Sequence, residues 1–239
     1  MGIAEIIDRR DENDTGKDQA NMSIASFQRK PSSLLQTEIA ACESVKQVID
    51  IAVTAEALAV TALGGAIANA ENGLLALNDE QIEVLKAARV AEQAHYEYLA
   101  VAGAEPLTTT FTIPDPAIVT DVPTFLSTII ALEEAFIAAY MAAAQVFTYR
   151  KQPELAQIAV SVAAVEAEHR AHARFYAIQA GLLEGVPNNY AFAPAMFTSV
   201  GEAAAALQSL GFIGGDGQEI TYPGPGEIEN PGVINLRPS

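Results

Sequence analysis

Residues 92–95 read Glu-Gln-Ala-His, and residues 166–169 read Glu-Ala-Glu-His. Each segment is a Glu-x-x-His motif within a stretch that has a helical pattern. Residues three apart point the same way from successive turns of a helix, so each motif can offer one carboxylate and one imidazole to a single ion. Two such pairs in one chain predict a helical protein with a site for two metal ions.

Two single glutamates complete the set of side chains that such a site requires. A carboxylate-bridged two-metal site in a four-helix bundle takes one Glu from each of two helices and one Glu-x-x-His motif from each of the other two. Glu56 precedes the first motif and Glu133 precedes the second at nearly the same interval, so each half of the chain carries one ligand and then a ligand pair. The predicted metal ligands are Glu56, Glu92, His95, Glu133, Glu166 and His169.

The neighbours of these residues decide some choices and leave others open. Glu56 is preferred over other acidic residues nearby because it lies deep in an apolar stretch, where a carboxylate without a counter-charge is costly to bury. Glu133 shares a helical face with bulky apolar residues, and adjacent Glu134 is the alternative ligand. Tyr140 lies two turns after Glu133, either beside the metals or as a core tyrosine. His172 is expected at the rim of the site or next to the ligands, and it is an alternative ligand should one of the six be lost.

Composition and helix-breaking residues divide the chain into an arm, a bundle and a tail. Residues 1–31 are polar and mixed in charge, which is typical of an arm. Residues 182–239 carry a short helix over 200–210 and then a Gly/Pro-rich irregular tail. We expect the arm and tail to pack on the bundle or to mediate self-association with other copies. Between them, residues 32–181 carry four helical stretches, over residues 33–70, 79–103, 122–150 and 153–181.

The segment 104–121 separates the second helical stretch from the third. It contains three prolines, which forbid a continuous helix. In extended form about 18 residues reach up to ~60 Å, whereas a helix of about 24 residues is only ~36 Å long. The connection can therefore run along the whole bundle, so that the second and third helices are parallel. The sequence predicts an all-α four-helix bundle with one long crossover between its second and third helices.

The charge balance excludes several classes of partner. The chain has 13 Lys and Arg against 30 Asp and Glu, a formal net charge of −17, which repels phosphate backbones and anionic lipid surfaces. We therefore expect no nucleic-acid partner. The sequence also contains no Gly-rich phosphate loop, Gly-x-Ser-x-Gly elbow or Cys-pair zinc signature, so nucleotide enzymes and serine hydrolases find no support.

Two further stretches bear on membranes and location. Residues 51–70 are long enough to cross a bilayer, but they lack basic flanks and an aromatic belt. We expect a bundle helix there and no membrane span. Arg9 and Arg10 are not followed by an apolar run, so no export signal is visible. A cytoplasmic location is the default expectation, and an exported one follows if the chain is a processed form.

Two runs of residues resemble the ferritin-like superfamily. Residues 132–140 read LEEAFIAAY and residues 165–172 read VEAEHRAH, and together they look most like the ferritin-like-domain branch that includes desiccation-related and stress-response proteins. The resemblance spans about residues 35–181 and implies that the six residues above take the family's ligand positions. The superfamily includes ferritins, rubrerythrins, manganese catalases and di-iron oxygenases. The resemblance therefore implies a metal site, but it does not identify the reaction.

Two classes of function follow. Carboxylate oxygens with imidazole nitrogens suit Fe and Mn, and two such ions can pass two electrons to O₂ or peroxide. The first expectation is therefore a di-iron or di-manganese protein with oxidase, ferroxidase or peroxide-consuming chemistry. The alternative is a structural or stress-protection assembly protein, in which metal ions only staple the helices or are absent. Metal-free carboxylates would repel each other and weaken the bundle, so a melt with and without chelator separates the two.

Overall fold

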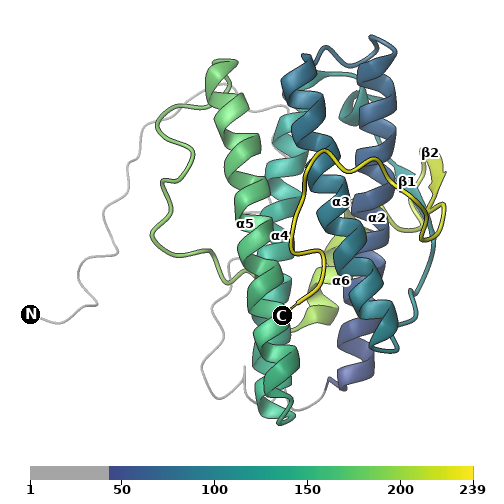
Figure 1. The fold of residues 1–239 in the computed structure, drawn as a ribbon, viewed down its shortest axis with the longest axis vertical. Coiled ribbons are helices and arrows are strands. Elements are labelled where there is room, and N and C mark those ends of the chain that lie inside the picture. Colours follow the sequence, from purple (N-terminus) through teal and green to yellow (C-terminus); the bar gives the residue numbers. More distant parts are fainter. Residues whose placement is uncertain (1–42, 239) are drawn as a thin grey trace, which may run out of the picture.

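A computed structural model describes residues 43–238 of the chain (Figure 1). The predicted four-helix bundle is confirmed within this range. It is accompanied by two short helices, η3 (Pro116–Val119) and α6 (Val200–Ser209), and by two strands, β1 (Thr110–Ile113) and β2 (Gln218–Thr221). The predicted arm lies outside the described residues. The four long helices are α2 (Val45–Glu71), α3 (Asp79–Val101), α4 (Val122–Tyr149) and α5 (Pro153–Gln179).

Side-chain caps fix the starts of the first two long helices. At the start of α3, Asn78 accepts a hydrogen bond from the Gln81 N–H, and the Gln81 side chain accepts one from the Asn78 N–H, which closes a capping box. Ser44 and Gln47 form the same arrangement at the start of α2. A continuous helix from residue 33 is therefore wrong, because Ser44 has an extended backbone with φ −84° and ψ 156° and the helix begins at Val45.

Two contacts between distant residues establish the directions of the helices. The Arg150 side chain at the end of α4 donates to the carbonyl of Glu43 just before α2, at 2.9 and 2.7 Å. Near the end of α2, the Asn69 side chain donates to the carbonyl of Val119 just before α4, at 2.9 Å. Helices α2 and α4 are therefore antiparallel. Since α3 turns back along α2, it runs parallel to α4, and the predicted long crossover is confirmed (Figure 1).

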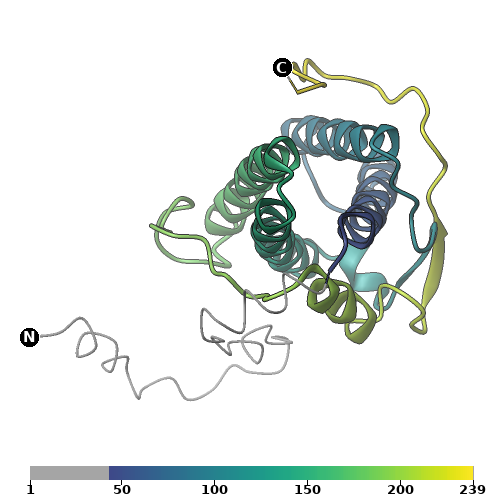
Figure 2. The ribbon, with the colours of Figure 1, turned by 90° about the horizontal axis from the view of Figure 1, so that it is seen from below.

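The crossover and the tail contain a small sheet that the sequence did not predict. Strands β1 and β2 pair antiparallel, with Thr110 opposite Thr221 and Ile113 opposite Gln218. Phe111 of β1 is fully buried in the main core. Beyond β2 the tail leaves the sheet and passes around the outside of the bundle to the side of α3 (Figure 2). The part of the tail that the structure describes therefore packs on the bundle.

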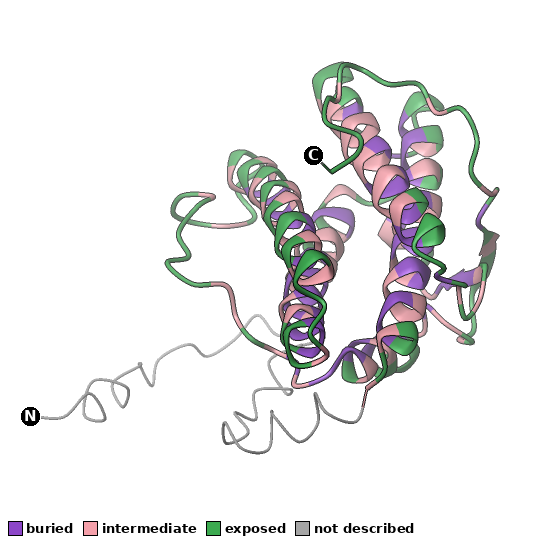
Figure 3. Cartoon of the chain, turned by 60° about the horizontal axis from the view of Figure 1, so that its bottom comes forward, coloured by how far each residue is buried: buried purple, intermediate pink, exposed green. Residues whose placement is uncertain are grey.

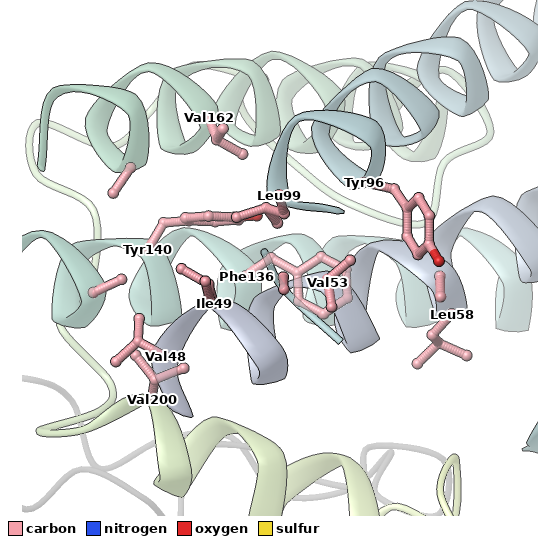
Figure 4. Close-up of a cluster of buried hydrophobic side chains, with 14 of the residues drawn as sticks. Val48, Ile49, Val53, Leu58, Tyr96, Leu99, Phe136, Tyr140, Val162 and Val200 are labelled. Carbon is pink, nitrogen blue, oxygen red and sulfur yellow. The ribbon is translucent and has the colours of Figure 1, made fainter. Parts of the chain in front are cut away.

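The core is formed by the facing sides of the long helices, and the exposed residues lie outside (Figure 3). The largest apolar cluster includes Val48, Ile49 and Val53 of α2 together with Phe136 and Tyr140 of α4 (Figure 4). A second cluster lies at the other end of the bundle, where the end of α2 meets the start of α4. Between these two apolar regions, the four long helices α2, α3, α4 and α5 carry the predicted ligands.

Helices α2 and α4 are long and apolar enough to cross a membrane by length and composition. About half of each apolar window, 56% and 50%, is buried inside the bundle. Each helix also carries a buried glutamate, Glu56 or Glu133, that faces the other helices. These features are those of core helices in a bundle, as the sequence predicted for residues 51–70.

Candidate metal centre

The six predicted ligand residues meet in the interior of the bundle. The four glutamates are almost completely buried, and the two histidines are partly buried. Helices α2 and α4 contribute one glutamate each, whereas α3 and α5 contribute a Glu-x-x-His motif whose two side chains project from successive turns. The structure therefore brings together Glu56, Glu92, His95, Glu133, Glu166 and His169.

The first group of side chains surrounds His95. Its Nδ1 lies 3.4 Å from Oε2 of Glu92, 3.5 Å from Oε1 of Glu166 and 3.6 Å from Oε2 of Glu56. The four groups offer ligand atoms that all lie within 4.8 Å of one another. Three carboxylates and one imidazole around one small volume form a set of ligands suited to one divalent cation.

The second group surrounds His169 and repeats this arrangement. Its Nδ1 lies 3.0 Å from Oε1 of Glu92, 3.1 Å from Oε2 of Glu166 and 3.8 Å from Oε1 of Glu133. Glu92 and Glu166 thus belong to both groups, and each turns one oxygen toward one histidine and its other oxygen toward the other. The arrangement suits two neighbouring cations that share two carboxylates.

Unpaired polar atoms mark the same place. Buried polar groups in proteins are almost always hydrogen-bonded. Among the described residues, eight buried side-chain atoms have no hydrogen-bond partner, and six of them belong to this cluster. So many unpaired oxygen and nitrogen atoms in one place are suited to bind metal ions. The six atoms are Glu56 Oε2, both carboxylate oxygens of Glu92, His95 Nδ1, Glu133 Oε2 and Glu166 Oε1.

The pKa values of the clustered residues are shifted in different directions. Burial raises the pKa of Glu56 and Glu133 well above the ordinary value, and repulsion by neighbouring carboxylates adds to it. Burial also opposes charge on Glu92, but attraction to the nearby His169 and His95 imidazoles holds its pKa well below the ordinary value. Burial lowers the pKa of each histidine, but attraction to the surrounding glutamates outweighs this effect and raises the pKa. In the metal-free protein these shifts favour the protonated form of both histidines.

The structure shows where three further residues discussed in the sequence analysis lie relative to the cluster. Glu134 points away from the centre, because its Oε1 accepts a hydrogen bond of 2.8 Å from the Tyr190 hydroxyl, whereas Glu133 points inward. Tyr140 is buried and donates a hydrogen bond to Glu56, so it is both a core residue and a direct neighbour of the cluster. His172 is exposed and stacks on Tyr176, as expected of a rim residue.

Sequence reasoning missed one part of the surroundings. Residues 232–238 of the tail lie over the space between α3 and α5 that leads to the two histidines. A Gly/Pro-rich composition gives no periodic pattern from which such a contact can be predicted. The signal that could have drawn attention to it is the pair of apolar residues Ile234 and Leu236 within an otherwise polar tail.

Comparison with known proteins places this geometry in a family. A model of the ferritin-like domain matches residues 44–179. The matched range contains all four long helices and all six clustered residues, and it leaves out α6 and the tail. Comparisons with curated proteins and with solved structures gave no match.

Proposed function

Because this chain belongs to the ferritin-like domain family, we propose that it binds two Fe or Mn ions and acts as an oxidoreductase on O₂ or peroxide. One observation carries the proposal. Glu92 and Glu166 each turn one oxygen toward His95 and the other toward His169. A carboxylate between two donor groups in this way is suited to bridge two cations, and a single cation would leave half of the arrangement unused.

The donor set favours Fe and Mn. Hard carboxylate oxygens with imidazole nitrogens suit these ions, whereas thiolate ligands would favour softer ones. No cysteine occurs among the described residues, and the single Cys42 lies just outside them. Formal charge agrees, because four carboxylates around two histidines leave a deficit of positive charge that two divalent cations fill.

The protein's own residues have distinct roles in this proposal. The bound ions would supply the two-electron redox chemistry. Glu92 and Glu166 would hold both ions at a fixed separation, and His95 and His169 would each bind one ion from the side of α3 or α5. Tyr140 holds the Glu56 carboxylate through its hydroxyl. Apolar clusters lie at both ends of the centre, and apolar surroundings strengthen electrostatic interactions.

Metal content is the first test. The purified protein, stripped with chelator and reconstituted with Fe(II) or Mn(II), should hold two ions per chain by elemental analysis. The reconstituted protein should consume O₂ or peroxide, and the stripped protein should not. Protein that takes up no metal after reconstitution would remove the proposal.

A melt with and without chelator then distinguishes catalysis from a structural role. Ligands that bind only the folded state raise its stability, so metal removal should lower the melting temperature in either case. A large stability loss without any turnover would favour the structural or stress-protection alternative. Self-association and the stress-response branch stay predictions, and a solution mass of a single chain would contradict the first.

A further inference from the structure

A cavity of about 780 Å³ lies between α3 and α5. In the rest of the bundle α2 packs on α3 and α4 packs on α5, but α3 and α5 make few contacts with each other. Their facing positions recur at helical spacing and line the cavity instead, with Leu85, Ala88 and Ala91 on α3 and Ile158, Val162 and Val165 on α5. The cavity is therefore elongated along the bundle, with the faces of α3 and α5 as its sides and residues of α2 and α4 at its base.

The inner wall of the cavity is the metal centre. His95, Glu133 and His169 all line it. Two of their buried atoms, His95 Nδ1 and Glu133 Oε2, have no hydrogen-bond partner among the described residues. A molecule in the cavity would thus lie directly beside the ions of the proposed function.

The walls indicate which class of molecule fits. A metal ion as substrate needs oxygen ligands along its route, but Glu133 and Glu168 are the only carboxylates among the lining residues. O₂ or peroxide alone is too small to require this space, since a water molecule occupies roughly 30 Å³. Pockets for organic molecules span roughly 300–1,000 Å³ and are mainly apolar with a few polar groups. Size and composition together favour an organic molecule.

We propose that this cavity binds an elongated, mainly apolar organic molecule, with an alkyl chain between α3 and α5 and one part of the molecule against the metal centre. This inference rests on the proposed function in one respect, namely that metal ions occupy the inner wall of the cavity. The binding of the chain follows from the apolar walls, because burial of each CH₂ group contributes about 0.8 kcal/mol.

The tail forms the outer wall of the same cavity. Residues 232–238, which we call the C-terminal strap, line it opposite the metal centre, and Figure 1 shows the tail crossing in front of α3 toward α5. The ion pair between Lys86 and Glu229, at 3.2 Å, holds the segment just before the strap on α3. Within the strap, Ile234 is 77% exposed, so its side chain does not fill the cavity that the strap lines.

The test is a titration of two probes, dodecanoate and decan-1-ol, followed by calorimetry. Both probes are titrated into metal-free and Mn-loaded protein. Ala88→Phe places a ring in the cavity one turn before Glu92 and two turns before His95, at a residue that is not itself a proposed ligand. Ala100→Phe makes the same change on the same helix at an exposed position outside the cavity. We expect wild type and Ala100→Phe to bind alike, and Ala88→Phe to bind about tenfold more weakly because its ring overfills the site.

The outcomes separate the cavity from the metal centre. Probe binding by a protein that takes up no metal would support the cavity while the proposed function fails. Two Mn per chain with no binding of either probe would overturn the cavity proposal and leave the metal centre standing. Equal binding by Ala88→Phe and Ala100→Phe would also overturn it. If the protein is a dimer in solution and Ala88→Phe dissociates it, this face binds a second copy of the chain. That result would also overturn the proposal.

Discussion

The hydroxyl of Tyr140 on α4 donates a hydrogen bond to Oε1 of Glu56 on α2. Both side chains are buried. Burial, followed by the nearby charge of Glu56, raises the pKa of the Tyr140 hydroxyl well above the ordinary value, so the hydroxyl stays protonated and acts as the donor. The bond connects two core helices at the edge of the cluster, where the other Glu56 oxygen has no hydrogen-bond partner.

Replacing Tyr140 with Phe should therefore destabilise the protein. The change removes the donor and leaves a buried carboxylate oxygen unpaired, which costs about 1–3 kcal/mol. We expect this loss in the free energy of unfolding, measured by urea denaturation of the metal-free protein. Tyr149→Phe is the control, because Tyr149 lies on the same helix and is half-exposed. Equal stability of the two variants would show that the bond to Glu56 contributes nothing.

Substitutions of the glutamates should affect metal content according to their place in the cluster. Glu166 belongs to both groups of ligand atoms, whereas Glu133 belongs only to the group around His169. Glu133→Gln should therefore retain one Mn ion per chain, and Glu166→Gln should lose affinity for both ions. Glu168→Gln is the matched control, since Glu168 is exposed on the same helix as Glu166. Elemental analysis after dialysis against Mn(II) measures the difference, and identical metal contents for the Glu133 and Glu166 variants would contradict shared bridging.

The stability of the metal-free protein should fall as the pH rises above neutral. His95 and His169 have pKa values raised above the ordinary 6.5, so their stabilising effect is fully present below pH 6.5 and is lost as the pH rises through the folded pKa. The raised pKa values of Glu56 and Glu133 act in the same direction, starting from 4.5. Glu92 acts oppositely, because its lowered pKa makes its contribution disappear as the pH falls below 4.5.

Metal binding should reverse the effect of alkaline pH. Ions bind neutral imidazole and ionised carboxylate, so binding displaces protons and strengthens as the pH rises. Urea midpoints at about pH 6 and about pH 9, with and without Mn(II), check both statements. The metal-free midpoint should drop between these values and the Mn-loaded midpoint should not. Calorimetry in two buffers of different ionisation enthalpy should detect the released protons, and equal heats in both buffers would argue against imidazolium in the metal-free centre.

The parts of the fold that could be predicted from sequence are those set by nearby residues. Asn78 and Gln81 are three apart, and the structure closes their capping box as a local signal requires. Gly103 and Gly181 follow helix ends with φ of +91° and +73°, a conformation that favours glycine. The Glu-x-x-His motifs are equally local, because their members lie on successive turns of one helix. The predicted cluster of six residues followed from such signals and from the bundle that they imply.

The parts that could not be predicted depend on residues far apart in the chain. Strands β1 and β2 have four residues each and are separated in the chain by η3, α4, α5 and α6. Neither strand carries enough periodic pattern to indicate its partner. The choice between Glu133 and Glu134 was likewise open, because it depends on Tyr190, which lies 56 positions after Glu134. The start of α2 was misplaced for a different reason, since Ser44 and residues 32–33 offer equally good caps in the sequence.

Gly217 permits the close approach of the two chain segments at the end of the small sheet, and its substitution should loosen the tail that leads to the strap. Gly217 precedes β2 with φ +147°, and a Cβ there would lie 2.3 Å from the carbonyl oxygen of Ile113, so Gly217→Ala should strain the end of the sheet by about 1–3 kcal/mol. Gly226→Ala is the control, because nothing lies within 4 Å of its Cβ position. Hydrogen exchange over residues 218–238 should accelerate in Gly217→Ala alone, while the amides of α3 and α5 and the bound Mn stay as in wild type. Equal exchange in both variants would show that the strap is held independently of the sheet.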